Sequence, residues 1–231
     1  LEIIRRRVLV GHCAERFDFQ TALWQFLIGL IQTTLAPEDE DAWFEIWEEG
    51  LEKTDLVKAF SKVEQAFIFG PQSPSFMQDF DKLEGEAVPL VALLPESPGE
   101  NTIKLNKDFF IKRGEKWFCP HCAVMALFSL QLNAPSGGQG YRTGLRGGGP
   151  LTTLIELHSY KGDPSVPLWR KLWANVMPEL ESNLSVPKRF DAYGFPWMQT
   201  RTSKAKGSET TPEQVNPLQA YWGMPRRCGS I

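Results

Sequence analysis

Glycine and arginine crowd one short segment, residues 133–154, which reads NAPSGGQGYRTGLRGGGPLTTL. The segment holds seven glycines and two arginines, Arg142 and Arg146, and it runs into an apolar, strand-like stretch. Because glycine has no Cβ atom, the backbone of a polyanion can approach the main chain there while amides and guanidinium groups donate hydrogen bonds to it. The segment therefore favours contact with nucleic acid or phosphate. A merely flexible surface loop is the alternative interpretation.

These glycines do not match the motifs of nucleotide-binding enzymes. A Walker-type phosphate loop needs Lys followed by Ser or Thr after its last glycine, whereas this chain reads Gly144-Leu145-Arg146. A dinucleotide fingerprint has the spacing G-x-G-x-x-G directly after a strand, whereas here the glycines are spaced G-x-G-x-x-x-G and follow a predicted helix. The pattern therefore argues against nucleotide hydrolysis.

A second candidate site is the CPHC tetrad, in which Cys119 and Cys122 stand three positions apart. Two thiolates at this spacing can share a metal ion, or can form a redox disulfide at a helix N-terminus. The other two cysteines, Cys13 and Cys228, are isolated, so the chain contains only half of a four-cysteine zinc site.

The tetrad, preceded by Phe118, also resembles the active site of the DsbA family of thiol oxidases. That fold needs a strand leading into the CxxC helix and a later cis-proline loop. Here roughly half of the chain precedes the tetrad and most of it is predicted to be helical. A thiol-disulfide oxidoreductase that uses Cys119 and Cys122 remains the alternative function.

Charge is unevenly distributed along the chain, although the net charge is only −3. Nine acidic residues and one lysine lie within 38–55, which we interpret as a solvated face. Seven basic residues and two acidic ones lie within 101–149, and a second basic cluster lies within 188–206. The basic segments, concentrated around the glycine loop, favour a polyanionic partner.

Composition and hydropathy limit the class of protein. With 231 residues, 42% of them hydrophobic, the chain can bury a sizeable core. The sequence shows no membrane-length apolar run and no signal peptide at its start, and the few cysteines fit a reducing cytoplasm.

Most of the first seventy residues are predicted to form helices. Apolar residues recur at helical spacing over 19–35, 41–49 and 55–66, with Asp18 and Thr54 as the expected caps of the first and third helices. A further helix is expected after Cys122 and another over 168–177. Short strands are expected at VPLVALL (88–94) and over 150–158. The fold class is therefore α+β, a large irregular mixed domain with a helical N-terminal part and short strands.

Several separate segments, in this order, resemble one family. They are FMQ at 76–78, the CxxC, the helix ending in NAP, the glycine loop, GLRGGGPLTTL, and the late PLQAYWGMPRR. The chain resembles CasA, the large subunit of the type I-E CRISPR complex Cascade. The resemblance implies a non-catalytic subunit in antiviral defence, in which an N-terminal domain precedes a four-helix bundle. Since the bundle is absent, residues 1–231 are expected to be that N-terminal domain, incomplete at both ends.

The resemblance also implies partners and site residues. The expected partners are the guide RNA, double-stranded target DNA, the other Cascade subunits and a recruited helicase-nuclease, in the cytoplasm and without a membrane. The motif flanking the DNA target would be read in the minor groove by the loop 136–140, whose residues, with two arginines, are Ser136, Gly137, Gly138, Gln139, Gly140, Arg142 and Arg146. The 5′ end of the guide RNA would meet Asn106, Phe109, Phe110, Lys112 and Arg113. Cys119 and Cys122 would form half of a zinc site in the intact subunit, with no cofactor required for catalysis.

Overall fold

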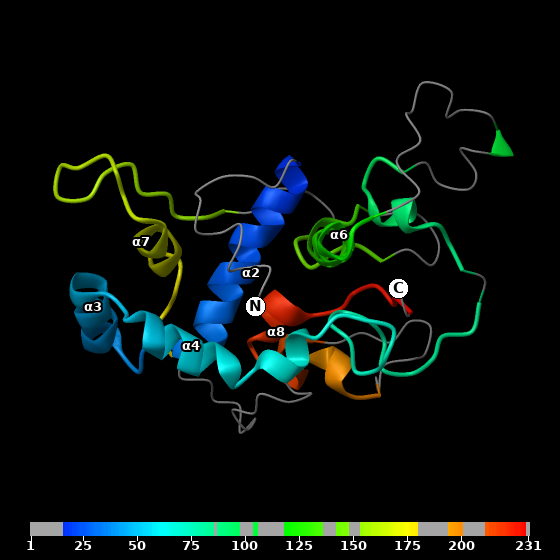
Figure 1. Cartoon of the computed structure of the whole chain (residues 1–231), viewed down its shortest axis with the longest axis horizontal. Helices are drawn as coiled ribbons and strands as arrows, with labels where there is room; N and C mark the ends of the chain where they lie inside the picture. Colours follow the sequence, from blue (N-terminus) through cyan, green and yellow to red (C-terminus); the bar gives the residue numbers. More distant parts are fainter. Residues whose placement is uncertain are drawn as a thin grey trace.

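The chain folds around one long helix, α2, with the other elements packed along it (Figure 1). A computed structural model describes residues 16–85, 87–97, 104–105, 118–135, 142–147, 153–179, 194–200 and 211–229. The α-helices within these ranges are α2 (Phe17–Leu35), α3 (Glu40–Glu49), α4 (Lys53–Ser61), α6 (Pro120–Asn133), α7 (Leu168–Trp173) and α8 (Gln219–Trp222). The 3-10 helices are η2 (Glu64–Phe67), η3 (Leu90–Leu93), η4 (Pro196–Met198) and η5 (Pro212–Gln214).

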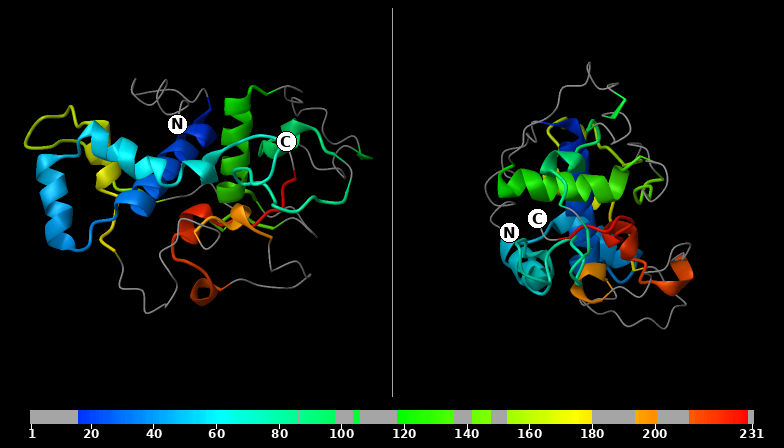
Figure 2. Two further views of the ribbon diagram at one scale, coloured as in Figure 1. Left: turned by 60° about the horizontal axis from the view of Figure 1, so that its bottom comes forward. Right: turned by 90° about the vertical axis from the view of Figure 1, so that its right-hand side faces the viewer.

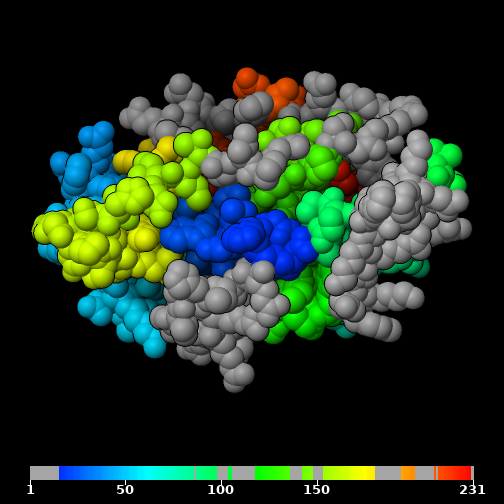
Figure 3. Space-filling model, turned by 90° about the horizontal axis from the view of Figure 1, so that it is seen from above, coloured from blue at the N-terminus to red at the C-terminus, as the bar shows by residue number. Residues whose placement is uncertain are grey.

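Helix α2 contacts α4, α6, α7 and α8 directly, and it therefore connects parts of the chain that are distant in sequence. Helices α6 and α3 lie on opposite sides of it (Figures 1 and 2). On the face drawn in Figure 3, the first half of α2 reaches the surface between the segment after residue 153 (yellow-green) and α6 (green). Among the described residues, no helix combines the length and apolar character needed to cross a bilayer.

The main core is a cluster of aromatic rings centred on Phe26 of α2. Its ring meets those of Phe67, Phe76, Phe128 and Trp222 edge to face, with centroids 5.4–5.9 Å apart. Edge-to-face contact is a preferred geometry for aromatic pairs because the positive ring edge meets the negative face. The polar end of Trp222 is also satisfied, since its indole N–H donates to the Thr33 hydroxyl at 2.8 Å.

A second aromatic cluster joins α3 and α7 to α2. Trp43 stacks on Trp47 with centroids 5.2 Å apart, and it lies 6.2 Å from Trp173, which is fully buried. The indole N–H of Trp43 donates to the Val176 carbonyl at 2.8 Å, and that of Trp173 donates to the Trp43 carbonyl at 3.2 Å. These bonds fix the acidic helix α3 to the core although no residue of α3 itself is fully buried.

Segments outside the helices are held by side-chain amides instead of neighbouring strands. Three amides each bond both the backbone N–H and the backbone carbonyl of one distant residue at 2.7–3.0 Å: Gln32 with Met177, Asn175 with Ile155, and Gln131 with Arg226. An amide side chain offers one acceptor and two donors, so it can replace the partner that a strand would provide. Within the described ranges, the only β-type pairing is an isolated bridge between Tyr160 and Asp163.

The sequence predicted the helices better than the strands. The helices expected over 19–35 and 41–49 are confirmed with small shifts of their bounds, whereas the one expected over 55–66 is α4 followed by the separate turn η2. The strand expected at 88–94 is wrong, because Pro89 precedes the 3-10 helix η3. The described part of the strand expected over 150–158 is extended but unpaired.

The expected caps also differ from the observed ones. Asp18 lies inside the first turn of α2 and pairs with Arg16, whose guanidinium Nε donates to it at 3.0 Å. Helix α4 begins after Glu52, so Thr54 lies inside that helix.

Replacing Trp222 by Ala tests the main core. The change removes a fully buried ring and leaves the Thr33 hydroxyl without its donor, so we expect the free energy of unfolding to fall by about 3–5 kcal/mol in denaturant titrations. The control is Phe44→Ala, since Phe44 is 59% exposed and its removal should cost about 0.5 kcal/mol. Equal losses in the two variants would contradict the placement of Trp222 in the main core.

Candidate nucleic-acid interface

The glycine loop predicted to contact DNA is anchored on the end of helix α6. Its residues 136–140 lie outside the described residues, but the chain on both sides of them is described. After the loop, the chain folds back along the last turn of α6, where the amides of Gly144, Leu145 and Arg146 donate to the carbonyls of Ala134, Gln131 and Leu132 at 2.8–2.9 Å. Residues 142–147, which we name the return segment, are therefore fixed to a helix of the main core.

Gly144 is required by close packing in the return segment. A Cβ atom at this position would lie 2.4 Å from the Leu132 carbonyl oxygen and 2.6 Å from the Ala134 nitrogen. Both contacts are with backbone, which cannot move aside as a flexible side chain would. This glycine of the GLRGGG motif thus has a structural role.

Arg226 joins the two ends of the loop. Its guanidinium donates from Nη2 to the Pro135 carbonyl at 2.9 Å and from Nε to the Arg142 carbonyl at 2.8 Å. Gln131 holds the backbone of Arg226 in turn, and the adjacent Arg227 pairs with the buried carboxylate of Asp79 at 2.8 Å. A segment almost a hundred residues away in sequence therefore sets the separation of the loop's ends.

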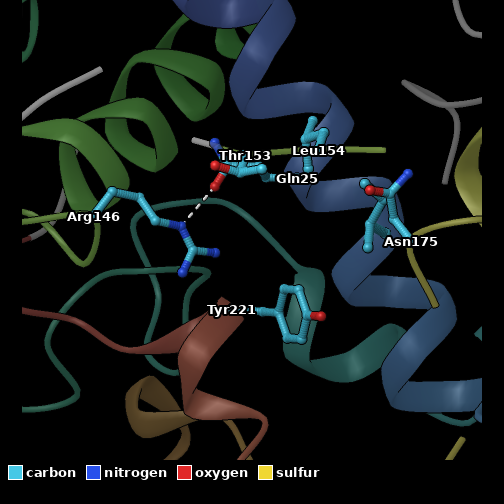
Figure 4. Close-up of a pocket in the computed structure, with 7 residues that line it drawn as sticks. Gln25, Arg146, Thr153, Leu154, Asn175 and Tyr221 are labelled. Carbon is cyan, nitrogen blue, oxygen red and sulfur yellow. Dashed lines mark hydrogen bonds between the residues drawn. The ribbon is translucent and has the colours of Figure 1, made fainter. Parts of the chain in front are cut away.

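The two arginines that the sequence groups together lie in different surroundings. Arg142 is exposed at the end of the loop. Arg146 is half-buried, and its Nε–H donates to the Gln25 Oε1 atom of α2 at 2.8 Å in a pocket between α2, the return segment and α8 (Figure 4). Burial lowers the pKa of the Arg146 guanidinium from its ordinary value.

The CPHC tetrad opens α6 at the end opposite the loop. Cys119 is the N-cap residue, and its sulfur accepts a hydrogen bond from the Cys122 amide at 3.3 Å. Cys119 is exposed and Cys122 is half-buried. A helix N-terminus favours negative charge on such sulfurs, which suits a metal ligand. Among the described residues there is no group of three or more His, Cys, Asp or Glu side chains that could hold a metal ion.

The predicted RNA contacts cannot be placed. Asn106, Phe109, Phe110, Lys112 and Arg113 all lie outside the described residues. Helix α3, which carries acidic residues in its first turn, lies across α2 from α6 (Figure 1).

Comparison with protein families identifies the chain. The model of the family described as CRISPR-associated protein Cse1 matches residues 3–229. The chain belongs to the Cse1 family. A search of curated proteins found no match. The Cse1 match confirms the resemblance to CasA, and it makes the chain a CRISPR-associated subunit of Cascade that assembles with other subunits.

Sequence reasoning missed the residues that position the loop in this Cse1 chain. Arg226 and Gln131 had no recognisable motif role, because a bond between positions 95 residues apart leaves no local pattern. The available signal was that PLQAYWGMPRR, which contains Arg226, was among the segments that matched the family.

Replacing Gly144 by Ala tests the anchoring of the loop. Because the new methyl group would overlap backbone atoms of α6, we expect a loss of about 2 kcal/mol or more in the free energy of unfolding. Gly70→Ala is the control, since a Cβ atom there meets nothing within 4 Å. A Gly144→Ala variant as stable as the control would rule out the tight packing of the return segment.

Proposed function

We propose that this Cse1 chain is a non-catalytic subunit of a type I-E Cascade complex that recognises the motif flanking the DNA target. The loop Ser136–Gly140 contacts the minor groove of double-stranded DNA, and Arg142 contacts a phosphate beside it. Minor-groove edges offer a degenerate hydrogen-bonding pattern, so a glycine-rich backbone senses groove shape and accepts several motifs. Base pairing with the guide RNA provides most of the sequence specificity.

The observation that carries this proposal is the closure of the loop by Arg226. The two carbonyls that flank the loop, those of Pro135 and Arg142, accept hydrogen bonds from the same guanidinium group. A loop with fixed ends loses less conformational entropy when it binds. The fixed ends therefore support a role of the loop in binding.

The remaining assignments of the proposal extend the same function. Asn106, Phe109, Phe110, Lys112 and Arg113 contact the 5′ end of the guide RNA by stacking and charge. The complex acts in antiviral defence in the cytoplasm, where it recruits a helicase-nuclease to the bound DNA.

Cys119 and Cys122 supply two of four ligands of a structural zinc ion in the intact subunit. The 3.3 Å bond from the Cys122 amide to the Cys119 sulfur suits this role, because backbone amides commonly support thiolate ligands. Zinc would link the start of α6 to a second pair of ligands elsewhere and would take no part in chemistry.

Changing Gly138 and Gly140 to Leu in the assembled complex tests the loop. The bulky side chains would keep the backbone away from the groove, so we expect at least tenfold weaker binding of target duplexes, or ~1.4 kcal/mol, together with altered preference among flanking motifs. Quantitative binding assays over a panel of duplexes measure both effects. Unchanged affinity and unchanged preference would exclude the loop from recognition.

Arg142→Ala tests the phosphate contact separately. Loss of one phosphate contact should weaken binding to all flanking motifs equally and reduce the slope of log K against log salt concentration by about one. The control is Lys58→Ala on α4, an exposed cation of another element. A variant of Arg142 that keeps the full salt dependence would remove this residue from the interface.

The cysteine pair distinguishes the proposal from a thiol-disulfide oxidoreductase. We expect no catalysis of insulin reduction by the chain, and we expect zinc in native mass spectra of the intact subunit that disappears when Cys119 and Cys122 are changed to Ser. Cys228→Ser is the control for loss of a single thiol. Catalytic turnover that depends on Cys119 would favour the oxidoreductase instead.

A further inference from the structure

A pocket of about 330 Å³ lies beside the side chain of Arg146, which is one of the residues that line it (Figure 4). Its polar lining comes from five parts of the chain: Gln25 of α2, Arg146 of the return segment, Thr153 and Asn175 of the loops on either side of α7, and Tyr221 of α8. Ile28 and Leu154 complete the wall. Residues from distant parts of the sequence thus line one pocket together with a guanidinium group.

Arg146 carries a charge that the described protein does not neutralise. Its only hydrogen bond within the described ranges joins Nε to Gln25 Oε1, and no carboxylate of those ranges pairs with it. Arginine stays protonated in proteins even where burial lowers its pKa, as it does here. A half-buried cation of this kind is costly to maintain unless an anion joins it.

The side-chain amides in the pocket already have hydrogen-bond partners. The donors that remain for a ligand are the guanidinium nitrogens and the hydroxyl groups. Asn175 bonds to Ile155 and to the Lys171 carbonyl, and Gln25 orients Arg146. The Nη atoms of Arg146 face the cavity beside the ring of Tyr221 (Figure 4). Burial raises the pKa of Tyr221, so its hydroxyl is protonated at neutral pH and can donate.

We infer that this pocket binds a phosphate group, held by the Nη atoms of Arg146 and by the hydroxyls of Tyr221 and Thr153. A guanidinium edge with two free nitrogens matches the spacing of phosphate oxygens. The pocket is larger than one phosphate, so it has room for the group that carries the ester. That group belongs either to a small phosphorylated molecule or to the backbone of nucleic acid; the second source rests on the proposed function, and the first does not.

Titration of the chain with inorganic phosphate, at constant ionic strength set by chloride, tests this inference. By calorimetry we expect saturable binding at one site, weakened about tenfold or more in Arg146→Gln. Lys58→Gln, an exposed cation on α4, should bind phosphate as the original chain does. Tyr221→Phe removes one donor without removing the guanidinium, and it should weaken binding severalfold, so the test does not depend on the folding of one variant.

Competition experiments distinguish the sources of the phosphate. If a short DNA duplex displaces inorganic phosphate, the pocket binds the nucleic-acid backbone; if only ribose 5-phosphate, used as a small phosphomonoester probe, displaces it, the ligand is a small molecule. Either result supports the site. Absence of saturable binding, equal binding by Arg146→Gln, or acetate binding as tightly as phosphate would overturn it. Because the phosphate titration contains no DNA, its outcome is independent of the test of the glycine loop.

Discussion

Backbone groups outside the helices need hydrogen-bond partners, and in the described parts of this chain side-chain amides provide some of them. Gln32, Gln131 and Asn175 each bind the N–H and carbonyl of a residue far away in sequence. An unpaired polar group in the interior would be costly, so each amide fixes the path of a segment that has no neighbouring strand. The backbone at Met177, Ile155 and Arg226 is consequently held in place by these side chains.

The aromatic core is connected to the candidate interface through Gln131 and Arg226. Phe128 lies on α6 and packs against Phe26. Gln131 lies three positions later on the same helix, and its side-chain amide bonds to the backbone of Arg226. Arg226 then bonds to both ends of the glycine loop. The rigid rings, the amide and the guanidinium form one continuous connection from the centre of the molecule to the surface proposed to contact DNA.

The sequence predicted what is periodic and local. Helical spacing located α2 and α3, and the order of several short segments pointed to the Cse1 family. Bonds between distant positions could not be predicted, because neither Gln131 nor Arg226 has a local pattern that reveals its partner. The strand-like composition of VPLVALL led to a wrong prediction, because Pro89 precedes a 3-10 helix there. The closeness of Arg142 and Arg146 in sequence did not reveal that one is exposed and the other half-buried.

The two hydrogen bonds from Arg226 hold the ends of the loop, so changes within the loop need not affect the rest of the fold. Only six positions lie between Pro135 and Arg142, and the carbonyls on which Arg226 acts lie outside them. Closing a chain between fixed ends costs little more when a residue is added, so substitutions and insertions within this interval need not disturb the aromatic interior. The loop can therefore vary in sequence and length while the hydrogen bonds at its two ends stay the same.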